Sequence, residues 1–245
     1  MERKNAIITG GAGFIGSHLS ERLLKEGFDN VYLIDNLVRT ENLRNVQDNP
    51  KIKFLYGDVS TFDFSVIKNV THFFHLAATR INRCAKFNRE GHEYIANSGF
   101  NVVDYCTKNK IKLFFASTAS VYNKPKVQPI KEDSPCTPHT VYGAGKYYTE
   151  NLIRSYDNMY GLDYTINRFF SVYGPRMDCE GAYTEVIFNW LSQVHKGNNE
   201  ITVYVSQSRS SIDLVNEIPN WVETLNTSLF ELNVVKIIAL TTSST

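Results

Sequence analysis

A tyrosine and a lysine stand four residues apart in the segment Val141-Tyr-Gly-Ala-Gly-Lys146. Side chains at this spacing lie on one face of a helix, one turn apart. An ammonium group beside a phenol favours ionisation of the phenol, whose unperturbed pKa is about 10. The spacing therefore predicts Tyr142 as a general base and Lys146 as its supporting charge. Because tyrosine and lysine also fall four apart by chance, the pair is informative only together with a second motif.

A glycine-rich loop near the start of the chain supplies that second motif. Its text, Thr9-Gly-Gly-Ala-Gly-Phe-Ile-Gly16, follows an apolar run at residues 6–8 and opens a segment with helical apolar spacing at residues 14–26. The glycines permit a tight turn, close approach of the backbone to a pyrophosphate and close contact between helix and strand. The start of the helix offers N–H groups and a positive dipole end to the phosphates. The loop predicts dinucleotide contacts at Gly10, Gly13, Phe14, Ile15 and Gly16.

An acidic residue, Asp35, ends a second apolar run at residues 31–34. A carboxylate about twenty positions beyond the glycine loop suits the adenosine ribose hydroxyls. It would repel a 2′-phosphate, so the sequence predicts NAD as the cofactor in preference to NADP. The alternative is that Asp35 is only a turn residue in the text Asp-Asn-Leu.

Apolar strands and helical segments alternate through the first two-thirds of the chain. We expect further strands at residues 51–56, 71–76, 111–116 and 162–169, helices at 89–108 and 142–160, and a proline-containing loop at 123–139. This alternation predicts an α/β fold, a doubly wound parallel sheet of the Rossmann type with helices on both faces. Ligands then bind beyond the carboxyl ends of the strands, where five small or polar residues fall: Gly10, Asp35, Asp58, Ala77 and Thr118.

The alternation breaks after Ser171, which predicts two parts of the chain. Residues 1–170 form the NAD-binding Rossmann domain, and residues 171–245 form a substrate lobe partly interleaved with it. Within the lobe we expect helices at 183–195 and 215–225 and strands at 201–205 and 234–240. This second part is too short for a free-standing domain.

Bulk properties exclude several classes of protein. The chain has 245 residues, of which 42% are hydrophobic, enough for a sizeable core. A formal net charge of +1 gives no reason to expect nucleic acid or an anionic membrane surface as a partner. No apolar stretch is long enough to span a bilayer, and the start runs straight into the first strand, leaving no room for a signal peptide. The cysteines at 84, 106, 136 and 179 lack metal-like spacing, so we expect no metal and a reducing cytoplasm.

Seven motifs between residues 5 and 176 resemble, in order, those of the extended short-chain dehydrogenase/reductase family, in its nucleotide-sugar epimerase and dehydratase branch. They are Thr9-Gly-Gly-Ala-Gly-Phe-Ile-Gly-Ser-His18, Asp35-Asn36, Gly57-Asp58-Val59, His75-Leu-Ala-Ala78, Ser117-Thr-Ala-Ser-Val-Tyr122, Tyr142-x-x-x-Lys146 and Arg168-Phe-Phe-Ser-Val-Tyr-Gly-Pro-Arg176. The resemblance implies NAD as cofactor, a nucleotide sugar as substrate and a homodimer as the assembly.

The resemblance also implies roles for individual residues. Thr118 would bond the sugar hydroxyl beside Tyr142, and Lys146 would also hold the nicotinamide ribose. Asn97 resembles a helix asparagine that supports the catalytic groups, although an ordinary polar helix residue explains it equally well. The cofactor contacts implied in this way are Asn36, Asp58 and Val59, of which the last two edge the adenine, with Leu76, Ala77, Ala78 and Asn97.

The substrate contacts rest on the same resemblance. Arg209 resembles an arginine that grips the substrate diphosphate, a task suited to its rigid fork of donors; the alternative is a solvated loop arginine. Ser171 and Arg176 are the other expected substrate contacts. Ser171 stands where the family often has asparagine, and Asn123 replaces the usual glycine after Val-Tyr. Family members usually run on past residue 245, so we expect a truncated substrate lobe.

The residues after Thr118 discriminate between reactions within this branch. Sugar 4,6-dehydratases carry an acidic pair there, because eliminating water needs an acid and a base, whereas this chain has Ala119 and Ser120. Related decarboxylating enzymes tend to place a glutamate nearby, and none is present. Reversible hydride transfer at one carbinol carbon is the chemistry that remains. We therefore predict an NAD-dependent nucleotide-sugar 4-epimerase, acting on a UDP-sugar through a transient 4-keto intermediate.

Two alternatives to epimerisation stay open. One is a nucleotide-sugar reductase or dehydrogenase with net redox change, which would release its cofactor in each turnover. The other is a non-catalytic NAD-binding module, which would not need Thr118, Tyr142 and Lys146 together. The homodimer is expected through the helices at 89–108 and 142–160, which carry apolar residues on more than one face; the alternative is that these residues pack on the sheet. They are Val102, Val103, Leu152 and Ile153.

Overall fold

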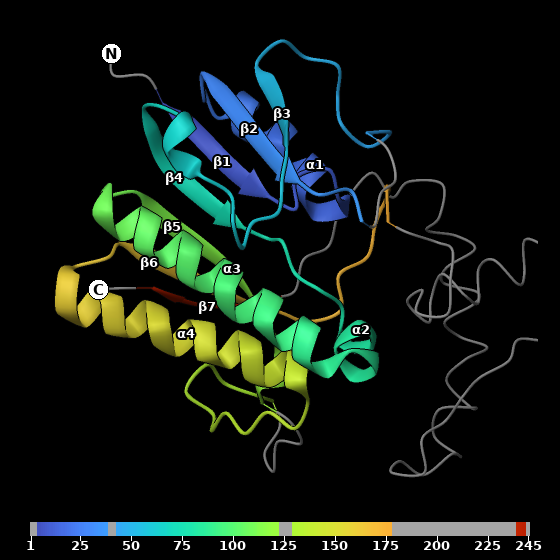
Figure 1. The fold of residues 1–245 in the computed structure, drawn as a ribbon, viewed down its shortest axis with the longest axis vertical. Helices are drawn as coiled ribbons and strands as arrows, with labels where there is room; N and C mark the ends of the chain where they lie inside the picture. Colours follow the sequence, from blue (N-terminus) through green and yellow to red (C-terminus); the bar gives the residue numbers. More distant parts are fainter. Residues whose placement is uncertain (1–3, 39–42, 123–128, 178–238, 244–245) are drawn as a thin grey trace, which may run out of the picture. The chain divides into compact units, whose positions relative to one another are not determined.

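A computed structural model describes residues 4–38, 43–122, 129–177 and 239–243 of the chain. This part holds a seven-stranded sheet with the order β3-β2-β1-β4-β5-β6-β7 (Figure 1). Strands β1 to β6 are parallel neighbours, and β7 runs antiparallel to β6. The strands are β1 (Asn5–Thr9), β2 (Asn30–Asp35), β3 (Ile52–Tyr56), β4 (Val70–His75), β5 (Lys112–Thr118), β6 (Tyr164–Phe169) and β7 (Ala239–Ser243).

Helices cover both faces of this sheet. Helices α3 and α4 lie side by side over one face, and α1 packs on the other (Figure 1). The fold class that the sequence predicts, a doubly wound parallel sheet of the Rossmann type, is confirmed. The helices are α1 (Phe14–Lys25), α2 (Ile81–Lys86), α3 (Asn88–Lys108) and α4 (Val141–Tyr160), with short 3₁₀ turns at Phe64–Val66 and Ala119–Val121.

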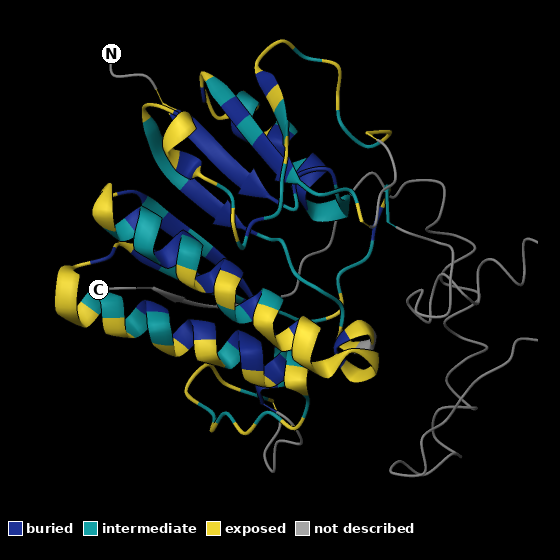
Figure 2. Ribbon diagram, viewed as in Figure 1, coloured by how far each residue is buried: buried dark blue, intermediate teal, exposed yellow. Residues whose placement is uncertain are grey.

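Two hydrophobic cores follow from the alternation of side chains along the strands. In β1, Ile7 points into the core under α3 and α4, where it joins Val102 and Ile153. Its neighbours Ala6 and Ile8 point to the opposite core, where Leu23 of α1 covers them. Figure 2 shows the result, with buried inner faces and exposed outer faces on α3 and α4. A strand buried on both faces is therefore apolar throughout, as residues 6–8 are.

Local signals fix both ends of α4, the helix that carries Tyr142. The side chain of Thr140 caps the start by accepting a hydrogen bond from the backbone N–H of Gly143 at 3.0 Å. Gly161 ends the helix with a left-handed backbone, φ 71°, which favours glycine. These caps place Tyr142 in the first turn, at the carboxyl edge of the sheet.

Most expected elements are present, with some differences. The last described strand, residues 239–243, overlaps the end of the strand expected at 234–240, of which residues 234–238 lie outside the described residues. It joins the main sheet although its residues fall in the range expected for the substrate lobe. Helix α2 was not expected, because six residues of mixed polarity show no apolar period. The elements expected at 183–195, 201–205 and 215–225 lie outside the described residues, so the division at residue 170 stays a prediction.

The apolar residues expected at a dimer contact belong to the core of the monomer. Val102, Val103 and Ile153 are buried under the sheet, and Leu152 packs against them. Sheet packing therefore explains their presence on these helices, and they give no support to a dimer.

We expect Ile153→Ala to destabilise the protein by about 2–5 kcal/mol, because it leaves a cavity in the core beneath α4. The matched control is Met159→Ala on the same helix, whose side chain is 68% exposed and whose loss should change the unfolding free energy by less than about 0.5 kcal/mol. Urea unfolding of both variants measures the difference. Equal losses in the two variants would contradict the placement of this core.

Candidate active site

The glycine loop forms a cradle between the end of β1 and the start of α1. Gly10 has a left-handed backbone, φ 69°, and a Cβ atom there would lie 3.0 Å from the backbone N of Ala77. A Cβ at Gly16 would overlap the carbonyl oxygen of Gly10 and lie 2.7 Å from Cα of Gly11. Gly13 is the N-cap of α1, so no side chain caps its first turn. Bare backbone and an uncapped helix start fit the phosphates of a dinucleotide.

Asp35 lies at the end of β2 with both carboxylate oxygens engaged by backbone. Its Oδ2 accepts from the N–H of Ala12 in the glycine loop at 3.2 Å, and its Oδ1 accepts from Leu37 at 2.9 Å. The bond to Leu37 is the turn contact that the alternative interpretation requires. Each carboxylate oxygen has further acceptor capacity, so the same side chain is also held where ribose hydroxyls can reach it.

The end of β3 supplies the next edge of the cradle. Asp58 accepts two hydrogen bonds from Ser60 on Oδ1, and Asn36 reaches its Oδ2 at 3.5 Å. Val59 is buried in the core, so only its backbone can face an adenine. Its carbonyl accepts from Asn101 of α3 at 2.8 Å, which fixes this loop to the helix.

One residue beside this edge was not anticipated from the sequence. Burial, with the charges of Asp58 and Asp35, raises the pKa of Tyr94 on α3, so its phenol lies within electrostatic range of both carboxylates. A tyrosine among helix residues gives no sequence signal for that position. Tyr94 therefore extends the cradle from β2 and β3 to α3.

The turn after β4 closes the cradle on the side of the sheet's switch in strand order. The Thr9 hydroxyl pairs with Nδ1 of His75 at 2.8 Å and accepts from the N–H of Ala77 at 3.3 Å. Leu76, Ala77 and Ala78 are half-buried there. Burial, with the charge of Lys146, holds the pKa of His75 well below its ordinary value, so the ring is neutral.

The three expected catalytic residues meet at the end of β5. Thr118 is the last residue of that strand; its side chain accepts from the backbone N–H of Ser120 at 3.1 Å and lies close enough to Tyr142 to lower the pKa of the phenol. Lys146 is buried one turn further along α4, where Nζ donates to the carbonyl of Ala116 at 2.8 Å and lies over the ring of Phe115. The structure thus brings a phenol, a hydroxyl and an ammonium into one site.

The pKa of the phenol differs from the sequence expectation. Burial raises the pKa of Tyr142 to about 12, a bond from Thr118 opposes this rise, and the charge of Cys84 adds to it. Burial also lowers the pKa of Lys146 to about 8. The expectation of a lowered pKa for Tyr142 is therefore not met, because loss of hydration is the largest influence on the phenol and outweighs the effect of Thr118.

Asn97 is exposed on α3, and among the described residues no hydrogen bond links it to Thr118, Tyr142 or Lys146. Ile95 and Gly99 are α3 residues that face α4: a Cβ at Gly145 would lie 3.1 Å from Ile95, and a Cβ at Gly99 would lie 2.7 Å from the hydroxyl of Thr149. The supporting role of Asn97 therefore stays a prediction.

The structure describes two of the expected substrate contacts, Ser171 and Arg176. Ser171 is exposed, and Arg176 is half-buried with φ 68°; both belong to a second compact unit, residues 171–237. Arg209 and Asn123 lie outside the described residues. Their roles stay predictions.

A buried ion pair at the base of the site was also not anticipated. Glu150 of α4 and Arg168 of β6 are both buried, with Nη2 and Oε2 2.6 Å apart. A sequence signal for it exists: the alternation of β6 turns Arg168 inward with Tyr164 and Ile166, and a buried guanidinium needs a counter-ion.

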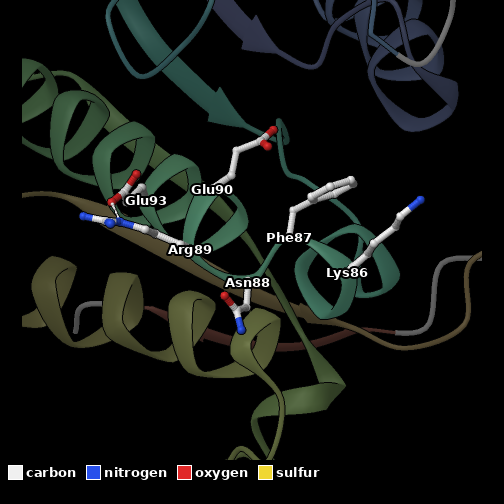
Figure 3. Close-up of a pocket in the computed structure, with 6 residues that line it drawn as sticks. All are labelled: Lys86, Phe87, Asn88, Arg89, Glu90 and Glu93. Atoms are coloured by element: carbon white, nitrogen blue, oxygen red, sulfur yellow. Dashed lines mark hydrogen bonds and ion pairs between the residues drawn. The ribbon is translucent and has the colours of Figure 1, made fainter.

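A hollow of about 320 Å³ at the junction of α2 and α3 is separate from the expected site residues (Figure 3). Its charged side chains already have partners: Arg89 pairs with Glu93, Glu90 pairs with Arg83, and the ammonium of Lys86 lies 5.2 Å from the centre of the Phe87 ring. Across the described ranges, no group of three or more metal-binding side chains is present. Nor is any described helix both long enough and apolar enough to cross a bilayer.

Comparison with known proteins gives one family. Residues 6–215 match the model of the NAD dependent epimerase/dehydratase family. A protein of Methanocaldococcus jannaschii, provisionally named a UDP-glucose 4-epimerase, is 36% identical over 202 residues, which cover 80% of this chain and 64% of that protein. UDP-glucuronic acid decarboxylase 1 of Arabidopsis thaliana is 30% identical, over 83% of this chain and 47% of that enzyme. The chain thus spans less than two-thirds of the length of these relatives.

Solved structures show the same likeness. The UDP-N-acetylglucosamine 4-epimerase of Methanobrevibacter ruminantium, in complex with UDP-N-acetylmuramic acid, has a TM-score of 0.77 and 29% identity, over 84% of this chain and 67% of that one. The UDP-glucose 4-epimerase of Thermus thermophilus, in complex with NAD, has a TM-score of 0.69 and 31% identity, over 79% of this chain and 63% of that one.

The glycine cradle makes a direct prediction for NAD binding. In Gly16→Ala the added methyl group meets the backbone of Gly10 and Gly11, so the loop must shift, and NAD affinity should fall about tenfold or more. Lys25→Ala, at the exposed far end of α1, is the control and should bind NAD as the unmodified protein does. Calorimetric titration with NAD measures both. Unchanged affinity in Gly16→Ala would place the dinucleotide elsewhere.

Proposed function

Because this chain belongs to the NAD-dependent epimerase/dehydratase family, we propose that it is a nucleotide-sugar 4-epimerase that acts on a UDP-sugar through a transient 4-keto sugar. The observation that carries the proposal is the meeting of Thr118, Tyr142 and Lys146 at the end of β5. The next two residues, Ala119 and Ser120, offer no acid or base for elimination.

NAD is the cofactor of this family, and the residues of the cradle fit it. The glycine loop would hold the pyrophosphate, Asp35 the adenosine ribose, and Asp58 with the Val59 backbone the adenine edge. When bound, oxidised NAD supplies a hydride acceptor and a positive charge beside the sugar. The carboxylate of Asp35 favours NAD over NADP, because a 2′-phosphate there would meet like charge.

The chain's own residues handle the proton. Tyr142 takes the proton of the sugar hydroxyl as hydride leaves the same carbon, and Thr118, close to Tyr142, is placed to hold that oxygen. A phenol with a pKa of about 12 is protonated at neutral pH, so this step requires positive charge nearby. Lys146 supplies such charge while it is protonated, which holds below its pKa of about 8. Return of hydride to the opposite face of the keto sugar inverts the carbon.

The alternatives differ in what they require. Decarboxylases occur among the relatives, but the acidic residue expected beside Thr118 is replaced by Ala119 and Ser120. A net reductase would use the same three residues and differ only in releasing its cofactor. A non-catalytic NAD-binding module would need neither Tyr142 nor Lys146.

The substrate lobe and the compartment complete the proposal. We assign the diphosphate of the sugar nucleotide to Arg209 and Arg176, with Ser171 nearby, in a lobe formed from residues 171–245. Arginine suits a diphosphate because its fork of donors is rigid and always charged. Scattered cysteines, without metal spacing, support the cytoplasm as the compartment.

We also propose a homodimer through the outer faces of α3 and α4. Phe100 of α3 is 48% exposed and Tyr148 of α4 is 44% exposed, so this double-helix face carries large apolar side chains outside the core. A two-fold contact through one such face would cover both.

Tyr142→Phe should lower turnover by about two to four powers of ten, because it removes the group that takes the proton. The control is Tyr160→Phe at the exposed end of the same helix, which should keep full turnover. The assay presents a panel of UDP- and GDP-sugars with NAD and follows sugar product and NADH separately.

Each result of this assay selects one function. Conversion of a UDP-sugar to its C4 epimer without accumulation of NADH supports the proposal. Stoichiometric NADH would identify a dehydrogenase instead, and normal turnover in Tyr142→Phe would remove Tyr142 from the mechanism. NAD binding without conversion of any sugar would favour the non-catalytic module.

Phe100→Asp should convert the proposed dimer to a monomer, because it places a charge in an apolar contact. The control is Phe87→Asp at the α2–α3 junction, where the ring is 45% exposed beside Lys86 and should not affect assembly. Light scattering at micromolar concentration measures the mass. A monomeric unmodified protein would contradict the dimer.

A further inference from the structure

Four side chains at four-residue intervals form one stripe along α4. They are Tyr142, Lys146, Glu150 and Arg154: a phenol, an ammonium, a carboxylate and a guanidinium in order. Lys146 and Glu150 are buried, whereas the side chain of Arg154 is 33% exposed and ends the stripe toward solvent. The reaction described above uses only the first two.

The carboxylate of Glu150 is fully buried and fully bonded. Arg168 of β6 grips it with two parallel bonds, Nε to Oε1 at 2.9 Å and Nη2 to Oε2 at 2.6 Å. Ser117 donates to Oε1 at 2.5 Å, and Arg154 donates to Oε2 at 3.0 Å. Burial alone would raise the pKa of Glu150, but the bonds from Arg168 and Ser117 and the two arginine charges hold the pKa below its ordinary value. The group is therefore an anion at neutral pH.

This anion ties the reacting end of β5 to α4. Three consecutive residues of the strand each meet one residue of the stripe. The carbonyl of Ala116 accepts from Lys146, the hydroxyl of Ser117 donates to Glu150, and the side chain of Thr118 lies close enough to Tyr142 to lower its pKa. The middle contact therefore fixes the register in which the outer two form.

Other charged and titratable groups face Lys146 from each element around it. Tyr142 and Glu150 come from its own helix, Cys84 from α2 and the neutral His75 from β4. Burial lowers the pKa of Lys146 to about 8, and the charges of Cys84 and Glu150 oppose that fall.

Two charged side chains contact Glu150: Arg168 of β6 and Arg154 of its own helix, α4. Tyr122 is uncharged, and its hydroxyl accepts a hydrogen bond from Nη1 of Arg168 at 2.6 Å. The Cys136 thiol lies within reach of the same charges, and burial raises its pKa. The two arginines more than neutralise Glu150, and after Cys84 the carboxylate of Glu150 is the group whose charge favours protonated Lys146.

We propose that Glu150 is a positioning residue for the Tyr142–Lys146 pair: held by Arg168, its carboxylate sets the end of β5 through Ser117 and favours the charged form of Lys146. The proposal rests on the proposed function, in which Lys146 supplies positive charge to the proton transfer. Glu150 would thus have two effects: a geometric one, the position of the end of β5, and an electrostatic one, the protonation of Lys146. Different substitutions separate the two effects.

Glu150→Gln removes the charge and keeps the size of the side chain. The pH at which Lys146 titrates should then fall from near 8 by about one to two units. Turnover at pH 8 should fall about five- to fiftyfold, with the alkaline limb of the pH profile moved by the same amount. Nuclear magnetic resonance of the protein with isotope-labelled lysine measures this titration without any substrate. The signal that disappears in Lys146→Arg identifies Lys146. Glu26→Gln, an exposed glutamate paired with Arg22 at the same spacing on α1, is the control and should change neither.

Ser117→Ala leaves Glu150 and Arg168 in place, and so guards against a simple failure to fold. It breaks the contact between Glu150 and β5, so turnover should fall about two- to tenfold at every pH, with the Lys146 titration unmoved. An unmoved titration in Glu150→Gln would overturn the electrostatic effect, and unchanged turnover in Ser117→Ala would overturn the geometric one. If no sugar is converted by the unmodified protein, the proposed function fails, and the Lys146 titration still decides the electrostatic effect.

Discussion

A carboxylate and a guanidinium, buried against each other, hold helix α4 to strands β5 and β6. Breaking such a pair by removing one partner costs about 3–5 kcal/mol, because an uncompensated charge stays behind in the core. Glu150 and Arg168 therefore add a directional constraint on the position of α4 to the apolar packing of Ile153 beneath the same helix. Every distance in the candidate site depends on that position, since Tyr142 and Lys146 lie on α4 and Thr118 lies on β5.

The same burial that makes the ion pair costly to break also shifts the pKa values of the catalytic groups. Removing water moves both reacting groups toward their neutral forms, so the pKa of Tyr142 rises to about 12 and that of Lys146 falls to about 8. A site in this state transfers a proton only when positive charge is present beside the phenol. In the proposed reaction, the positive charges of Lys146 and of oxidised NAD would therefore decide whether Tyr142 can take the proton.

Local patterns in the sequence were enough to predict the cradle. The glycine loop, Asp35 at the end of β2 and Thr118 at the end of β5 follow from spacing and strand ends, which neighbouring residues determine. Features that depend on distant partners were not predictable in this way. The exposure of Asn97 depends on how α3 is rotated against α4, and the burial of Val102 depends on the sheet beneath it. That Glu150 is a buried, ion-paired carboxylate depends on Arg168 of β6, eighteen positions away in the sequence. The rise in the pKa of Tyr142 likewise comes from burial, which no four-residue spacing reveals.

Hydride transfer out of and back to the same sugar carbon is the central claim, and an isotope label tests it most directly. A UDP-sugar carrying deuterium at C4 is incubated with the protein and NAD in ordinary water, and product and remaining substrate are analysed by mass spectrometry and nuclear magnetic resonance. The account predicts a C4 epimer that keeps its deuterium at C4, because the hydride returns from the bound cofactor without exchange. An epimer that has lost deuterium to solvent, or deuterium recovered in released NADH, would contradict it.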